Sequence, residues 1–305
     1  MRVLISGGCG FLGRYLVREF IARGAEVAVV SRPAGGLPLA TDTARSYLLD
    51  LPSDELSNCL REFKPDVFVH CAGKASVPAS IKDPHADFFS HVVVTESILH
   101  AIRTTIPSCK FVYLSSAAVY GQPLKLPVDE HAPCNPISPY GFHKHMAELL
   151  VREASEIHGV PTLVVRIFSA YGANLQRQVI WEMCKQAVHA KRIVLSGTGE
   201  EKRDFIHATD VASAIGILVN RDTKKHDVFN VASGTSVSIK EVAEWLGKHG
   251  GGISVEFHGQ INAGDPPDWR ADISKLRATG FRPSVQMNEG LLDVLAYAQS
   301  TIQDS

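Results

Sequence analysis

The sequence predicts an α/β protein, with a doubly wound parallel sheet followed by a smaller α/β region. In the first half of the chain, short apolar runs alternate with segments whose apolar residues recur at helical spacing. A glycine-rich turn, Gly7-Gly8-Cys9-Gly10, separates the first apolar run from the first helical segment. Alternation of this kind is typical of βαβ units, in which parallel strands carry helices on both faces of the sheet.

Each element of the first half follows from this alternation. The run Val67–Cys71 is apolar apart from His70, as expected of a strand that is covered on both faces. The strands expected in chain order are Arg2–Ser6, Glu26–Val30, Tyr47–Leu49, Val67–Cys71, Phe111–Ser115 and Thr162–Ile167. The helices expected between them and after them are Phe11–Arg23, Glu55–Phe63, Phe88–Thr104 and Gly141–His158.

The pattern changes after about Tyr171, where glycine and proline interrupt shorter elements. The strands expected there are Ile193–Leu195 and Ile253–Phe257, and the helices are Lys240–Lys248 and Asn288–Gln299. We therefore predict a dinucleotide-binding domain over residues 1–170 and a smaller substrate domain over residues 171–305. Residues 204–231 are expected to cross back to the first domain.

Composition excludes several classes of protein. Hydrophobic residues make up 45% of the 305 residues, so the chain can bury a core. A net charge of −1 without a basic run argues against general nucleic-acid binding. No apolar stretch approaches the roughly 20 residues of a membrane helix, and no signal-peptide pattern precedes the glycine turn. Scattered cysteines, and histidines without metal-ligand spacing, favour a cytoplasmic protein with no metal site.

The glycine-rich turn predicts a dinucleotide site. Gly7 allows a tight turn, Gly10 lets the backbone approach a pyrophosphate, and Gly13 lets the helix pack on the sheet. The first residues of the helix, Phe11 and Leu12, would present free N–H groups to the phosphates.

Residues at the ends of the next strands indicate which dinucleotide is bound. An acidic residue at the end of the second strand would bind the ribose of NAD, but this chain has Ser31 and Arg32 there. A hydroxyl and a guanidinium suit the 2′-phosphate of NADP, which we favour, with NAD and a solvated Arg32 as the alternative. Asp50 and Leu51 follow the third strand and are expected to meet the adenine. Ala72 and Gly73 follow the fourth, where small residues let a cofactor pass closely.

A tyrosine and a lysine four residues apart predict the catalytic group. On a helix, Tyr140 and Lys144 share one face, about 6 Å apart along the axis. We expect the neighbouring ammonium and the nicotinamide ring to lower the pKa of the phenol, so that Tyr140 exchanges a proton with a sugar hydroxyl. Ser116 follows a buried strand, and its hydroxyl could polarise the same substrate oxygen.

These motifs together resemble the extended short-chain dehydrogenase/reductases that act on nucleotide sugars. The matching segments are the glycine turn, His70-Cys71-Ala72-Gly73, Leu114-Ser115-Ser116-Ala117-Ala118-Val119-Tyr120-Gly121, Ser138-Pro139-Tyr140-Gly141-Phe142-His143-Lys144 and Arg203-Asp204-Phe205-Ile206-His207. The resemblance implies a Rossmann domain, a nicotinamide cofactor and a nucleoside-diphosphate sugar as substrate. It also implies that Ser116, Tyr140 and Lys144 form the catalytic triad and that Tyr140 and Lys144 contact the cofactor.

Two alanines narrow the reaction. Dehydratases of the resembled family carry Asp-Glu where this chain has Ala117-Ala118, and decarboxylases carry Glu at the place of Ala118. Alanine transfers no proton, so both reactions are disfavoured. Reduction of a 4-keto-6-deoxy sugar by NADPH and 4-epimerisation with internally recycled NAD stay open, and Arg32 favours reduction.

The resemblance also implies the substrate residues. Arg203 is expected on the substrate diphosphate, with Asp265 and Arg270 nearby, although Asn262 stands where the epimerase pattern has an arginine. Further substrate contacts are expected from Ser169, Asn174, Gln178 and Val179.

Other features are left open by the resemblance. His91 stands where the family usually has Asn, either as a core residue or beside the nicotinamide pocket. Cys134 and His143 flank the Tyr140 segment and are expected to be structural. A homodimer is expected through the helices Phe88–Thr104 and Gly141–His158.

Overall fold

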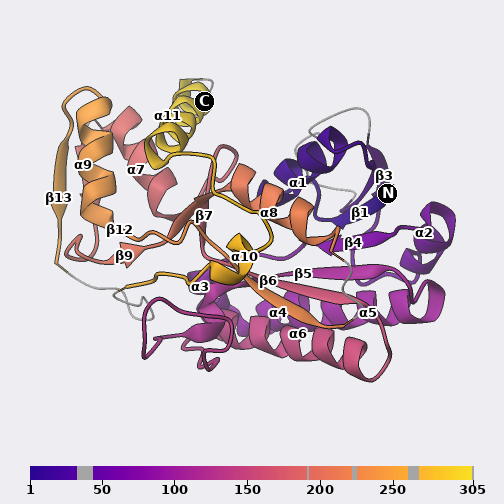
Figure 1. The fold of residues 1–305 in the computed structure, drawn as a ribbon. Coiled ribbons are helices and arrows are strands. Elements are labelled where there is room, and N and C mark those ends of the chain that lie inside the picture. Colours follow the sequence, from indigo (N-terminus) through magenta and orange to yellow (C-terminus); the bar gives the residue numbers. More distant parts are fainter. Residues whose placement is uncertain (33–43, 191, 222–224, 260–267, 304–305) are drawn as a thin grey trace.

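A seven-stranded parallel sheet forms the centre of the molecule, which a computed structural model describes over residues 1–32, 44–190, 192–221, 225–259 and 268–303. The strands are β1 (Arg2–Ser6), β2 (Glu26–Ser31), β3 (Arg45–Leu48), β4 (Val67–His70), β5 (Lys110–Ser116), β6 (Thr162–Ile167) and β11 (Asp227–Val231). Their order is β11-β6-β5-β4-β1-β2-β3, and each neighbouring pair is parallel (Figure 1). The order reverses direction at β1 and β4, so the predicted doubly wound sheet is confirmed.

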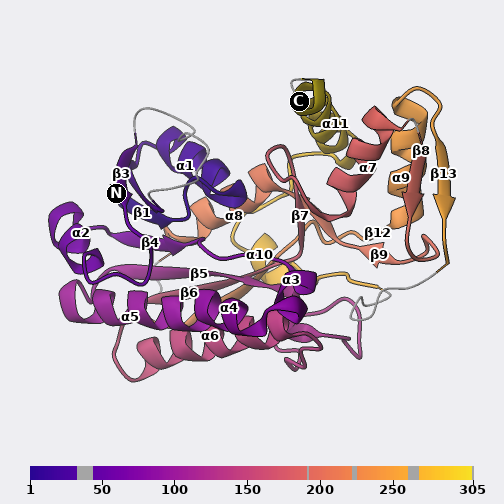
Figure 2. The same cartoon turned by 180° about the vertical axis from the view of Figure 1, so that it is seen from behind.

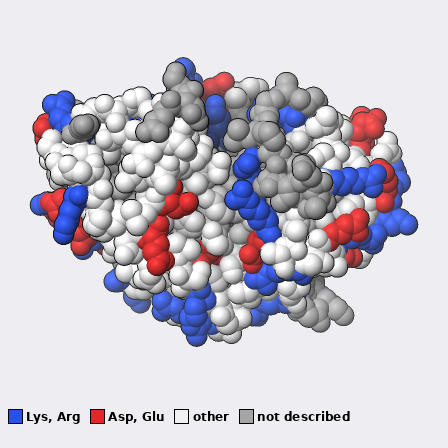
Figure 3. All heavy atoms as spheres, turned by 90° about the horizontal axis from the view of Figure 1, so that it is seen from above, with Lys and Arg blue, Asp and Glu red and all other residues white. Residues whose placement is uncertain are grey.

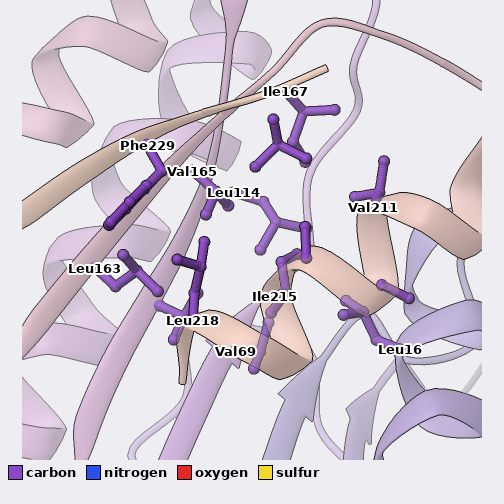
Figure 4. Packing of buried hydrophobic residues seen from close by; sticks show 14 of the residues in the cluster. Leu16, Val69, Leu114, Leu163, Val165, Ile167, Val211, Ile215, Leu218 and Phe229 are labelled. Atoms are coloured by element: carbon purple, nitrogen blue, oxygen red, sulfur yellow. The ribbon is translucent and has the colours of Figure 1, made fainter. Parts of the chain in front are cut away.

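Helices cover both faces of this sheet. On one face lie α1 (Phe11–Ala22) and α8 (Ala208–Leu218), and on the other lie α2 (Leu56–Phe63), α5 (Val94–Thr105) and α6 (Pro139–Glu156) (Figures 1 and 2). Successive strand residues point to opposite faces, so Val3 and Ile5 join the α1/α8 core while Leu4 joins the other. Figure 4 shows the α1/α8 core, where Ile215 and Leu218 of α8 face Leu163 and Val165 of β6. The inner strands are apolar on both sides, as expected where helices cover both faces, whereas the edge strand β3 is largely exposed.

A second, smaller α/β region has its own core. Its helices and longest strands are α7 (Gln178–His189), α9 (Ile239–His249), α11 (Met287–Gln303), β8 (Arg192–Leu195) and β13 (Ser254–Phe257). Met183, Leu246 and Val294 meet in this core. Two short strand pairs connect it to the sheet, β7 (Ser169–Tyr171) with β10 (Phe205–His207) and β9 (Lys202–Arg203) with β12 (Val237–Ser238).

Several short elements were not expected from the sequence. They are α3 (Val77–Lys82), α4 (Pro84–Phe88), a 3₁₀ turn η2 (Ala117–Tyr120) and α10 (Ser274–Arg277). A π-helical turn η1 (Phe89–Val93) lies within the helix expected over Phe88–Thr104. The helix predicted over Phe88–Thr104 in fact begins earlier, because Asp83 caps α4, and it continues through η1 into α5.

The surface of the described residues has mixed charge. On the face that Figure 3 shows, basic and acidic side chains lie in small interspersed groups. None of the described helices is long and apolar enough to span a membrane.

Candidate functional site

The turn between β1 and α1 has the geometry that the glycine motif predicts. Gly7 has a φ of +73° and donates its N–H to Val30 O, and a Cβ there would lie 2.8 Å from the backbone of Ala72. A Cβ at Gly13 would overlap the backbone of Gly7 and Gly8, so the helix requires glycine there. A Cβ at exposed Gly10 would approach only Gly7 O. No side chain caps α1, so the N–H groups of its first turn are available to a ligand at Gly10, which fits a pyrophosphate.

The ends of β2, β3 and β4 lie along the same edge of the sheet as this turn. Arg32 is exposed directly after β2, and Ser31 holds β3 by accepting the N–H of Leu49. Asp50 is exposed after β3, while Leu51 packs partly into the core. Residues 33–43, which follow Arg32, lie outside the described residues.

The loop after β4 is shaped around a histidine. Ala72 N lies 3.5 Å from Ser6 Oγ, so this loop stays against the first turn. Gly73 has a φ of +130°, and a Cβ there would lie 2.7 Å from Cε1 of His91. Glycine at this position therefore makes room for the His91 ring.

The structure brings the three predicted catalytic residues together. Ser116 ends β5, while Tyr140 and Lys144 lie on the inner face of α6 and are buried. Gly141 allows this approach, because a Cβ there would lie 2.5 Å from Ala118 O. Lys144 Nζ donates to Leu114 O at 2.8 Å and lies 5.9 Å from the ring centre of Tyr140.

Burial shifts the protonation equilibria of this group. Burial raises the pKa of Tyr140 to about 12, with Asp87 adding to the rise, while Ser116 and Arg177 lower it. The ammonium of Lys144 is directed to the Leu114 carbonyl. Burial also lowers the pKa of Lys144 to about 8. The sequence prediction combined the ammonium with the nicotinamide ring of a bound cofactor, so the lowering of the Tyr140 pKa stays a prediction for the cofactor-bound protein.

Two more residues near Tyr140 were missed by sequence reasoning. Arg177 directly precedes α7 and lies between Asn174 and Gln178, which have φ values of 70° and 69°. Its Nε is buried without a hydrogen-bond partner. Asp87 on α4 lies between His91 and His143. Apolar periodicity indicates where helices form, but it does not indicate the direction of these side chains.

The predicted substrate residues are spread over several short elements. Ser169 begins β7, and its N–H donates to Asp204 O. Gln178 is exposed, and Val179 packs against the core of the second region. The guanidinium of Arg203 lies 5.8 Å from the ring centre of Trp269, whose Nε1 donates to Gly121 O. Trp269 thus lies between Arg203 and Gly121, which belongs to the segment that follows Ser116.

The remaining substrate predictions concern residues 262–270. Arg270 is exposed and lines a hollow with Arg277 and Pro127. Asp265 and Asn262 lie outside the described residues.

A buried ion-pair network supports the strand that carries Ser116. Glu148 on α6 accepts hydrogen bonds from Arg166 and from Ser115 Oγ. Glu148, His145 and Cys134 offer ligand atoms within 4.8 Å of one another. Both carboxylate oxygens are engaged by the Arg166 guanidinium, which indicates a structural network. Cys134 lies beside His145 in this cluster, whereas His143 pairs with Asp87.

Comparison with known proteins gives consistent matches over nearly the whole chain. The model of the NAD dependent epimerase/dehydratase family matches residues 3–232. The chain is 31% identical to a UDP-glucose 4-epimerase of Lactobacillus helveticus, with 98% of this chain and 96% of the relative covered. The structure is similar to the NAD complex of a UDP-glucose 4-epimerase of Thermus thermophilus, with a TM-score of 0.89, 27% identity and coverage of 98% and 99%. It is also similar to TunA, an NAD-dependent NDP-hexosamine 5,6-dehydratase of tunicamycin biosynthesis, with a TM-score of 0.89, 28% identity and 98% of each chain covered.

Proposed function

Because this chain belongs to the NAD dependent epimerase/dehydratase family, we propose that it is a nucleotide-sugar 4-epimerase that recycles bound NAD within each turnover. The predicted family and its enzymatic nature are confirmed. The comparisons support 4-epimerisation, the alternative in the sequence analysis, better than the reduction of a 4-keto sugar that it favoured. One of the similar structures is a dehydratase, so overall similarity does not distinguish epimerisation from dehydration. The residues of the site are needed for that distinction.

The observation that carries the proposal is the pairing of Ser116 and Tyr140 beside two alanines. Ala117 and Ala118 follow Ser116 and are buried, so they supply no second acid or base for the loss of water. One phenol in contact with one hydroxyl is sufficient to move the single proton of a hydroxyl group. Epimerisation needs that proton and a hydride that is later returned to the opposite face of the same carbon. Reduction of a 4-keto sugar would use the same two groups, and the similarity to 4-epimerases favours epimerisation over it.

Each residue then has a separate task. Tyr140 removes the proton of the C4 hydroxyl and later returns one, and Ser116 donates a hydrogen bond to the same oxygen. NAD, when bound, supplies the hydride acceptor and a positive ring charge that favours the tyrosinate form. Lys144 would hold the ribose of the nicotinamide. Its directed contact with Leu114 O keeps the ammonium away from the phenol and fixed on the sheet.

We propose NAD as the cofactor in place of NADP, which the sequence analysis favoured. The similar epimerase from Thermus thermophilus is in complex with NAD, and Arg32 is exposed. The glycine turn and the uncapped start of α1 fit the pyrophosphate of either nucleotide.

The proposal is tested on the purified protein. The nucleotide released on denaturation should be NAD, and the protein should interconvert UDP-glucose and UDP-galactose without added NADPH. Tyr140→Phe should abolish turnover and keep the nucleotide, because the phenol hydroxyl contacts Ser116 and is not part of the phosphate site. NADPH consumption with a 4-keto sugar, in the absence of interconversion, would instead establish the reductase.

We also propose a homodimer. Apolar side chains are exposed on α4, η1 and α6, namely Phe88, Phe89, Phe142, Met146 and Leu149. Positions 142, 146 and 149 share one helical face, which a second copy would cover. Sedimentation velocity of the purified protein would decide between monomer and dimer.

A further inference from the structure

The loop between β7 and α7 has a backbone conformation that needs support from its surroundings. Asn174 has a φ of 70°, and Gln178, the first residue of α7, has a φ of 69°. Residues other than glycine rarely adopt such values, which persist only where surrounding contacts hold them. Asn174 and Gln178 are both predicted substrate residues, so the contacts that hold this β7–α7 loop, residues 172–177, bear on substrate binding.

Two helices from different regions of the molecule hold the backbone of Ala173, directly before Asn174. Tyr15 on α1 donates its hydroxyl proton to Ala173 O at 3.1 Å. Ala173 N donates to Oδ2 of Asp293 on α11 at 3.3 Å. Figure 1 shows β7, which leads into the loop, between α1 and α11. The β7–α7 loop is therefore held at one residue from a helix on the large sheet and from a helix of the second region.

A further residue of α11 holds the middle of the loop. Gln176 Nε2 donates to the hydroxyl of Tyr297 at 3.0 Å, and the Tyr297 ring packs against Trp181 of α7 with centroids 5.7 Å apart. Asp293 and Tyr297 are four residues apart, so they lie on one face of α11. This face of α11 thus contacts the β7–α7 loop at two places.

His207 and Gly172 support these contacts. Thr209 N donates to Nδ1 of His207, so the ring proton lies on Nε2, which is 3.4 Å from Oδ2 of Asp293. The His207 ring also packs edge-to-face on Tyr15, with centroids 5.9 Å apart. Gly172 has a φ of +151°, and a Cβ there would lie 2.9 Å from the Tyr15 hydroxyl. Glycine at this position therefore lets the hydroxyl reach the loop.

We propose that Tyr15, Asp293 and Tyr297 are positioning residues that hold the β7–α7 loop in the conformation that binds the nucleotide sugar. The proposal rests on the substrate class of the proposed function. Tyr15 also packs edge-to-face on Phe11, the first residue of α1, with centroids 5.7 Å apart. The helix that begins at the predicted dinucleotide turn therefore also holds the loop of the predicted substrate residues.

The test compares Asp293→Ala with Asp293→Asn as its matched control. Alanine removes the acceptor of the Ala173 N–H and should weaken UDP-glucose binding about 10-fold, whereas asparagine keeps an acceptor oxygen and should stay within about 2-fold of wild type. Both variants should fold, because the Asp293 side chain is half exposed. Tyr15→Phe keeps the ring and removes one hydrogen bond, so binding should weaken about 3- to 10-fold. Calorimetry on NAD-loaded protein that also carries Tyr140→Phe measures binding without turnover.

Hydrogen exchange of the same proteins shows whether the loop itself is released. Amide exchange in residues 172–178 should accelerate in Asp293→Ala and in Tyr15→Phe, while exchange in the strands of the sheet and the content of bound NAD should stay at wild-type values. A merely structural role would destabilise the whole molecule instead. Ser300→Ala removes a hydrogen bond from Ser300 Oγ to Tyr297 O within α11, so it should change neither loop exchange nor binding.

The outcomes separate this proposal from the epimerase assignment. Loop exchange or UDP-glucose affinity that stays at the wild-type value in Asp293→Ala and Tyr15→Phe would overturn the proposal, even where the wild type interconverts the sugars. If Asp293→Ala does not fold, Tyr15→Phe and Tyr297→Phe decide it in the same way. A wild type that binds UDP-glucose without interconverting it, and variants that lose this affinity, would overturn the epimerase assignment alone. A wild type that does not bind UDP-glucose would overturn both.

Discussion

The cofactor half and the substrate half of the candidate site are built by different means. In the cofactor half the backbone itself forms the contact surface, and glycines at the ends of β1 and β4 are fixed by neighbours within 3 Å. In the substrate half, side chains such as Arg203, Trp269 and Arg177 extend from short strands and loops. From this difference we expect substitutions in the cofactor half to affect folding, and substitutions in the substrate half to affect the affinity for the substrate.

The largest effect is expected at Gly13. A side chain in Gly13→Val would overlap the backbone of Gly7 and Gly8, which cannot move aside, so the free energy of unfolding should fall by about 4 kcal/mol. Urea denaturation measures this loss. Gly10→Ala is the matched control: its Cβ would lie 3.1 Å from Gly7 O and open to solvent, so unfolding should change by less than about 1 kcal/mol while NAD affinity falls. A Gly13→Val protein as stable as wild type would break the comparison.

The second test concerns Glu148, a buried carboxylate on α6, and its contribution to stability. Burial alone would raise the pKa of Glu148, but the neighbouring His145 and the hydrogen-bonded Arg166 lower it from 4.5 to about 2. The folded pKa is depressed, so the stabilisation by this carboxylate is complete above pH 4.5 and is lost as the pH falls towards 2. Glu148→Gln should lower the free energy of unfolding at pH 7 by about 3 kcal/mol, because it leaves Arg166 buried and unpaired.

The pH dependence of stability provides a second measurement on Glu148→Gln. Between pH 4.5 and 2, the stability of Glu148→Gln should fall less steeply with acid than that of wild type. Glu156→Gln, which breaks an exposed pair with Arg152, should unfold at the same urea concentration as wild type. Parallel acid profiles for Glu148→Gln and wild type would show that Glu148 does not carry this dependence.

The smallest effects are expected in the substrate half. Arg203→Ala should raise KM for UDP-glucose by about 10-fold, the loss of one hydrogen bond to a charged group, with an unchanged urea midpoint. Arg270→Ala removes the same type of side chain from the hollow that Arg270 shares with Arg277, and KM should change by less than about 2-fold. Steady-state kinetics distinguish them, and a larger effect at Arg270 would make Arg270 the phosphate contact.

The same division explains how far the sequence could predict this molecule. The sheet, its flanking helices and the meeting of Ser116 with Tyr140 follow from apolar periodicity and from the rule that parallel strands end at one edge. The raised pKa of Tyr140 could not be predicted, because it comes from the burial of the phenol and from Asp87 on another helix. Arg177 was missed for a similar reason: its flanking residues were singled out, but periodicity does not give the direction of a side chain in a loop with positive φ values.

The place of β11 at the edge of the sheet has a consequence for synthesis. β11 pairs with β6 in register from Asp227↔Leu163 to Val231↔Ile167, so about 60 residues separate the two strands in the chain. A ribosome adding about 5–20 residues per second needs on the order of 3–12 seconds to make that connection. During this time, β6 is an unpaired edge with free N–H and C=O groups. The nascent first half is then open to strand pairing with other chains, and Asp227–Val231 is the segment that ends this exposure.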